Sequence, residues 1–74
     1  MKAMTVKRIL KDLTDQCHGY HDAVHPIISG NGFTIYATVW ETTWSVDIKD
    51  GLLTLEINNN TEFIDTDSIT RITI

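Results

Sequence analysis

The chain has 74 residues, of which 42% are hydrophobic and 22% charged, and its 10 acidic and 6 basic residues give a formal net charge of −4. This composition predicts a single globular domain spanning residues 1–74. The lone cysteine excludes an internal disulfide, no apolar run approaches the roughly 20 residues of a membrane span, and the acidic balance argues against a duplex-binding domain. The short length also argues against an enzyme, because so short a chain has few residues with which to enclose a catalytic cleft. We therefore expect a small cytoplasmic binding module.

The first segment has the apolar period of a helix. We expect the helix to begin with Thr5 as N-cap and to end at Gly19, since glycine accepts the left-handed conformation that commonly ends helices. One apolar stripe at helical spacing is formed by Val6, Ile9, Leu10, Leu13 and Cys17.

Beyond residue 24 the apolar residues alternate with polar ones, which predicts half-buried β-strands. The alternating apolar positions are Phe33, Ile35, Ala37 and Val39 in one run, Trp44, Val46 and Ile48 in the next, Leu53, Leu55 and Ile57 in a third, and Ile69, Ile72 and Ile74 at the end. The mixed parity of the last set suggests a bulge or burial on both faces.

Asp50 and Gly51 lie between two of these runs and are typical of a two-residue hairpin turn. The register that follows pairs Lys49 with Leu52, Ile48 with Leu53, Val46 with Leu55 and Trp44 with Ile57. On one face of the hairpin every apolar side chain then faces an apolar one, whereas a one-residue slip would scatter them.

Four further turns are predicted. They lie around Thr42 and Thr43, at Gly30-Asn31-Gly32, at Asn58-Asn59-Asn60 and at residues 65–68. The first would pair Val39 with Val46 and Ala37 with Ile48, and the second would bring Ile28 opposite Phe33. The predicted fold is therefore α+β, with an N-terminal helix packed on an antiparallel meander sheet of four to five strands. A helix plus a small five-stranded barrel is the alternative architecture.

The only cysteine and all three histidines fall within residues 17–25, as Cys17, His18, His21 and His25. Thiolate and imidazole are the usual zinc donors, so this cluster predicts a structural Zn²⁺ site at the helix–sheet junction. On a continuous helix Cys17 and His25 would be about 12 Å apart, so one ion requires the chain to turn, which Gly19 and Pro26 would permit.

A second interpretation of the same cluster needs no metal. Cys17 lies on the apolar stripe, where it would be a small buried hydrophobe, and the histidines would be polar loop residues. Cys17 and His21 also have the chemistry of a nucleophile and base, but no third residue orients them, so no catalysis is expected.

Two sets of outward-facing residues are candidates for partner binding. Tyr36 and Trp40 are aromatic residues that share a predicted strand face with Thr38, and Tyr and Trp are enriched at interface hot spots. Asp47 and Glu56 are acidic residues on outward sheet positions, able to meet a basic surface on a partner. The alternatives are that the aromatic face is covered by other parts of the chain and that the acidic face is only solvated.

Over the whole chain, the length, the −4 charge and the helix-plus-sheet make-up resemble the small acidic anti-CRISPR inhibitors that phages and prophages direct against type II effector nucleases. Size, charge and composition carry the resemblance, and no motif does. It implies a cytoplasmic, non-catalytic protein that binds a large host nuclease.

Two functional hypotheses follow. The first is an inhibitor or adaptor that binds a host protein, with such a nuclease as the candidate, and is stabilised by zinc. The second is a small-barrel subunit without metal that self-associates through residues 69–74 and binds nucleic acid or protein as an oligomer.

Overall fold

The computed structural model describes residues 1–16, 25–38 and 42–74. Within these ranges the helix α1 (Ala3–Asp15) precedes the strands β1 (Ile27–Gly30), β2 (Phe33–Tyr36), β3 (Thr42–Asp47), β4 (Leu52–Ile57), β5 (Asn60–Asp65) and β6 (Ile69–Thr73), with a 3-10 helix η3 (Thr66–Ser68) before β6. The strands form two antiparallel three-stranded sheets, in the orders β2-β1-β6 and β3-β4-β5. The predicted α+β class is confirmed.

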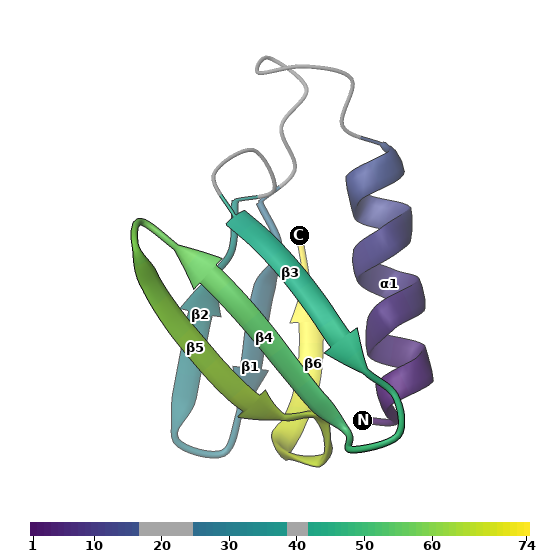
Figure 1. Cartoon of the computed structure of the whole chain (residues 1–74). Helices are drawn as coiled ribbons and strands as arrows, with labels where there is room; N and C mark the ends of the chain where they lie inside the picture. The colour runs from purple at the N-terminus through teal and green to yellow at the C-terminus, as the bar shows by residue number, and fades with distance from the viewer. Residues whose placement is uncertain (17–24, 39–41) are drawn as a thin grey trace.

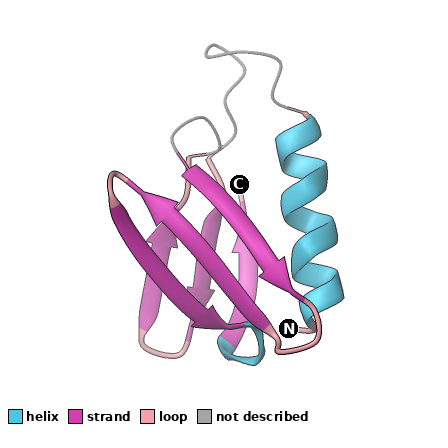
Figure 2. Ribbon diagram, in the orientation of Figure 1, coloured by secondary structure: helices cyan, strands magenta, loops and turns pink. Residues whose placement is uncertain are grey.

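The two sheets are stacked, and α1 runs along one side of the stack beside β3 (Figure 1). Figure 2 shows the same arrangement by element type, with α1 alongside the strands. One core lies between these layers and draws residues from all three described ranges. Its buried members are Val6, Leu10, Ile28, Ala37, Leu53, Leu55, Ile64 and Ile69.

The strand order differs from the predicted meander at the connection between β2 and β3. Thr42 and Thr43 were expected to form a turn, but both lie within β3. Ala37 does not face Ile48, because its N–H donates to the carbonyl of Pro26 at 2.9 Å; its other expected neighbour, Val39, lies outside the described residues. Since no described strand of one sheet pairs with the other sheet, the described strands form no closed barrel.

The β3–β4 hairpin has the predicted faces but a different register. The structure pairs Val46 with Leu53 and Trp44 with Leu55, two residues away from the predicted pairing. The Asp47 side chain accepts from the Asp50 N–H at 3.0 Å, and Gly51 closes the loop with a φ of 65°. A four-residue loop therefore replaces the two-residue turn, and a shift of two keeps the same side chains on the same face.

The other predicted turns are present, with one register change. Asn58 and Asn59 have φ of 50° and 69°, the left-handed pair that a type I′ hairpin requires. At the β1–β2 hairpin, Gly30 pairs with Phe33, so that Ile28 faces Ile35 and not Phe33 as expected. Residues 65–68 turn through η3.

The helix buries the predicted stripe but begins earlier than expected. Of the predicted stripe, Val6, Leu10 and Leu13 are buried and Ile9 is half-buried, while Cys17 lies outside the described residues. Thr5 is not the N-cap, because α1 begins at Ala3. The amino nitrogen of Met1 instead donates to the carbonyls of Thr66 and Ile69, at 3.0 and 2.8 Å, which ties the start of the helix to the β5–β6 connection. The helix also ends earlier than expected, at Asp15 with Gln16 as C-cap, and the predicted stop, Gly19, lies outside the described residues.

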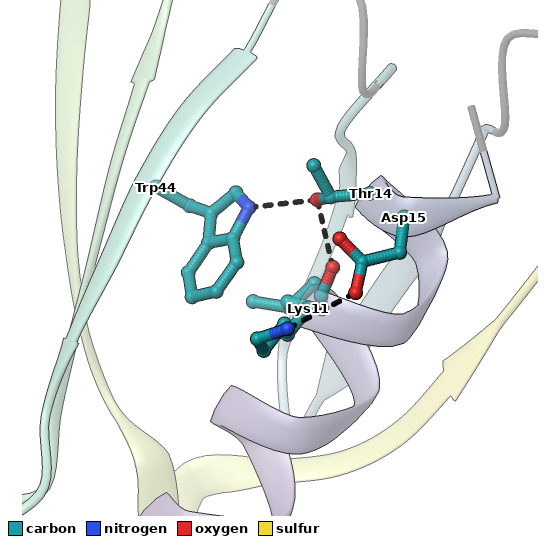
Figure 3. Close-up of polar contacts among 5 residues, drawn as sticks. Lys11, Thr14, Asp15 and Trp44 are labelled. Carbon is teal, nitrogen blue, oxygen red and sulfur yellow. Dashed lines mark hydrogen bonds and ion pairs between the residues drawn. The ribbon is translucent and has the colours of Figure 1, made fainter. Parts of the chain in front are cut away.

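A relay of two hydrogen bonds in series, running through the Thr14 hydroxyl, joins the helix to the sheet β3-β4-β5 (Figure 3). The indole Nε1 of Trp44 donates to the Thr14 hydroxyl at 3.1 Å, and that hydroxyl donates to the Leu10 carbonyl at 2.8 Å. Trp44 is thereby held on the inward face of β3, against the helix.

We expect Leu53→Ala to destabilise the protein far more than Ile48→Ala. Leu53 is fully buried on the central strand, and such truncations cost about 2–5 kcal/mol. Ile48 is 41% exposed in the β3–β4 loop, so its truncation should change stability by less than about 0.5 kcal/mol. Urea unfolding of both variants measures this. Equal losses would contradict the four-residue loop and favour the two-residue turn, which buries Ile48.

The relay predicts coupling between Thr14 and Trp44. In a double-mutant cycle of Thr14→Val and Trp44→Phe, the two changes should be non-additive by about 0.5–1 kcal/mol, the usual net worth of a neutral hydrogen bond. Thermal or urea unfolding of the four proteins gives the coupling. Strict additivity would show that the hydrogen bond contributes nothing in solution.

Candidate functional site

The outward face of the sheet β3-β4-β5 is the strongest candidate for a functional surface. Leu53, Leu55 and Ile64 point inward and are buried, so the alternate positions point out. These outward positions form three rows across the strands: Asp47, Leu52 and Asp65; Ser45, Thr54 and Phe63; Thr43, Glu56 and Thr61. We call this surface the acidic sheet face.

Phe63 is the most unusual residue of the acidic sheet face. Its side chain is 68% exposed although it belongs to a strand whose next residue, Ile64, is buried. β5 is the outer strand of its sheet, so the ring lies at the margin of the face beside Thr54. Fully burying such a side chain yields about 1.5–3 kcal/mol, which a partner covering the ring would gain.

The charges of the acidic sheet face all have one sign. Asp47, Glu56 and Asp65 are exposed, and no Lys or Arg occupies an outward position of its strands. Asp47 and Asp65 each use one carboxylate oxygen to hold a turn, accepting from the Asp50 and Asp67 N–H groups at 3.0 Å. In residues 1–16, 25–38 and 42–74 the only ion pair joins Lys11 and Asp15, so no described cation neutralises this face.

The four predicted partner-binding residues do not share one surface. Asp47 and Glu56 belong to the acidic sheet face. Tyr36 is 71% exposed but lies in β2, paired with Ile27 on the outward face of the other sheet. Because the sheets are stacked, these two faces point in opposite directions. Trp40 lies outside the described residues.

Phe63 was missed by the sequence analysis. The turns at residues 58–60 and 65–68 were recognised, but the stretch between them was not assigned as a strand. Two turns this close together indicate a strand between them that pairs with the preceding strand. A turn at Asn58 and Asn59 then places Ile64 opposite Leu53, as the structure has it. Phe63 must then point outward, so the signal was present in the turn spacing.

The predicted zinc ligands fall mostly outside the described residues: Cys17, His18 and His21 do so, and His25 is described. His25 is exposed, and its Nδ1 lies 3.1 Å from the Thr38 hydroxyl oxygen. If Nδ1 is the donor there, Nε2 keeps the lone pair that a metal would take. Within the described ranges no group of three or more His, Cys, Asp or Glu side chains is arranged to hold a metal. The zinc site stays a prediction.

The exposed side of α1 is basic over its N-terminal part, and Asp12 and Asp15 follow on the same side toward the C-terminal end. Four exposed residues lie close together on the side of the helix away from Val6, namely Met4, Lys7, Arg8 and Lys11. We call them the basic helix patch. Met4 is 62% exposed. Lys7 and Lys11 are like charges at i, i+4, a spacing that costs a helix about 0.2–0.5 kcal/mol.

The charge order along α1 also opposes the helix dipole. The first turn holds no acidic residue and the last turn no basic one, while Asp12 and Asp15 lie at the C-terminal end. A charge near the wrong end of a helix costs about 0.3–1 kcal/mol. Apart from the Lys11–Asp15 ion pair, the placement of these charges therefore does not serve helix stability.

Comparison with known proteins finds no matching family model, no matching curated protein and no matching solved structure. Among the residues that the structure describes, no helix combines the length and the apolar character needed to cross a bilayer.

The zinc prediction is tested by metal analysis of the purified protein. We expect one zinc per chain, lost in the Cys17→Ala/His21→Ala variant together with a lower melting temperature, because a structural metal contributes directly to folding. His25→Ala, measured separately, decides whether His25 is a ligand. Absence of stoichiometric zinc, or an unchanged melting temperature in the double variant, would contradict the site.

Proposed function

We propose that this chain is a non-catalytic protein-binding module of the cytoplasm whose binding surface is the acidic sheet face. The observation that carries the proposal is the exposure of Phe63 on a regular sheet face whose charged residues are all carboxylates. An exposed aromatic ring surrounded by polar groups is the usual arrangement of an interface hot spot.

The charge of the face specifies the kind of partner. Carboxylates at both ends of the face, Asp47 and Asp65 at one and Glu56 at the other, favour a protein surface with two separated basic regions. An apolar depression between them would receive the Phe63 ring.

A host effector nuclease is the partner we propose, with this chain as its inhibitor. The channel of a nuclease must attract phosphates and is therefore basic. A carboxylate-bearing sheet that occupies this channel would exclude nucleic acid by competition. The length and net charge of the chain, which resemble those of phage-encoded inhibitors, support the same proposal.

The size of the face sets a limit on how the partner binds. Three strands about 4.8 Å apart and six residues at about 3.3 Å each cover about 280 Å². A standard interface buries about 800 Å² on each partner. We therefore expect the partner to reach beyond the face, over the free edge of β5 or the adjoining loops. Zinc, where bound, would stabilise the fold and take no part in this contact.

The test is inhibition of DNA cleavage by a purified type II effector nuclease. We expect the wild-type chain to inhibit and the Glu56→Gln/Phe63→Ser variant to need at least about tenfold more protein, as loss of a hot spot implies. Tyr36→Ser is the matched control, because it removes an equally exposed aromatic residue from the opposite sheet.

The outcomes separate the parts of the proposal. If the wild-type chain neither binds nor inhibits the nuclease, the nuclease is the wrong partner. If the chain inhibits and Tyr36→Ser, but not the Glu56→Gln/Phe63→Ser variant, abolishes inhibition, the binding surface lies on the other sheet.

A further inference from the structure

The described part of the chain carries two surfaces of opposite charge that do not meet within one molecule. Three carboxylates of the acidic sheet face and three cations of the basic helix patch are exposed, and the one described ion pair, between Lys11 and Asp15, lies within the helix. Figure 1 shows why the two surfaces stay apart, since α1 lies beside the edge of the stacked sheets and not over the outward face.

The two surfaces also match in size and in apolar content. From Met4 to Lys11 the patch extends about 10 Å along the helix axis, at about 1.5 Å per residue. From Asp65 to Thr61 the sheet face extends about 13 Å along the strand. Each surface holds one exposed apolar side chain, 62% exposed for Met4 and 68% for Phe63, and methionine sulfur packs well against aromatic rings.

The charge pattern of the helix points to intermolecular use. Lys7 and Lys11 repel each other at i, i+4, and the acidic residues follow the basic ones in the order that the helix dipole disfavours. The Lys11–Asp15 pair is the one ion pair among the described residues that offsets these costs, and local rules broken on an exposed surface are typical of functional positions.

We propose that the basic helix patch of one copy docks on the acidic sheet face of a second copy, so that the chain associates head to tail. The inference rests on the acidic sheet face being a protein-binding surface, and it names a second copy as one partner of that face. Because the two contacting surfaces differ, each added copy leaves one surface of each kind free, and the contact can repeat. A host partner that takes the sheet face would compete with the next copy.

The small contact area makes this association weak and dependent on ionic strength. Opposite charges are screened within about 10 Å at 0.1 M salt and about 3 Å at 1 M. We therefore expect the mean mass, measured by light scattering, to rise beyond that of a dimer with protein concentration at low salt and to return to the monomer at 1 M salt.

Two variants with one surface inactivated each give the decisive experiment. Lys7→Glu/Arg8→Glu removes the helix patch, and Glu56→Gln/Phe63→Ser removes the sheet face. Each variant alone should be monomeric, while an equimolar mixture should form one-to-one dimers and nothing larger, because one intact surface of each kind remains. Arg71→Glu is the matched control, a charge reversal on the outward face of the other sheet, and should assemble like the wild type.

Misfolding is distinguished from loss of the contact by the melting temperature. Lys7→Glu/Arg8→Glu replaces the repulsive Lys7–Lys11 spacing with a Glu–Lys pair and places a second glutamate four residues before Asp12, so the two effects offset and this variant should melt close to the wild type. The proposal is overturned if the wild-type chain is monomeric at low salt and high concentration, or if the mixture of variants stays monomeric. It is also overturned if the helix patch binds duplex DNA while the chain stays monomeric. A monomeric chain that still inhibits the nuclease through Phe63 would leave the proposed function intact.

Discussion

Burial of Leu53 and Leu55 on the central strand β4 is the constraint on which the second sheet depends. Both side chains are almost completely buried between the sheets, so the alternation of the strand forces Leu52, Thr54 and Glu56 outward. Because β4 pairs with β3 on one side and β5 on the other, it also fixes which side chains of these two strands point inward and which point outward. The outward position of Phe63 is thus a consequence of core packing and not an accident of a mobile side chain.

The same constraint explains why a register shift of two residues leaves the surface unchanged. Moving β3 by two positions alters which residues form the loop, and it brings Ile48 out of the core into solvent. It does not exchange inward for outward side chains, because the period of a strand is two. Which residues lie on the proposed binding surface therefore depends only on the inward–outward alternation of the strands, whereas the local stability of the hairpin depends on the register.

The connection of the elements depends on backbone hydrogen bonds around Thr66. Its N–H donates to the Gly51 carbonyl at 2.8 Å, and its carbonyl accepts from the Met1 amino nitrogen. The β3–β4 loop, the β5–β6 connection and the start of α1 thus meet at one end of the molecule. Together with the Trp44–Thr14 hydrogen bond, this junction sets the position of the helix beside β3 and keeps its basic side away from the acidic sheet face.

The sequence by itself determined the α+β class, the buried stripe of α1, the inward and outward positions of β3 and β4, and the places of most turns. These features follow from local periodicity and turn chemistry, which do not depend on distant residues. Only the tertiary structure decided that the strands divide into two stacked sheets. This division depends on the pairing of β1 with β6, a strand more than 30 residues away in the sequence. For the same reason the predicted single sheet would have placed Tyr36 on the same outward face as Asp47 and Glu56. The two stacked sheets place Tyr36 on the opposite side and Phe63 on the face with the carboxylates.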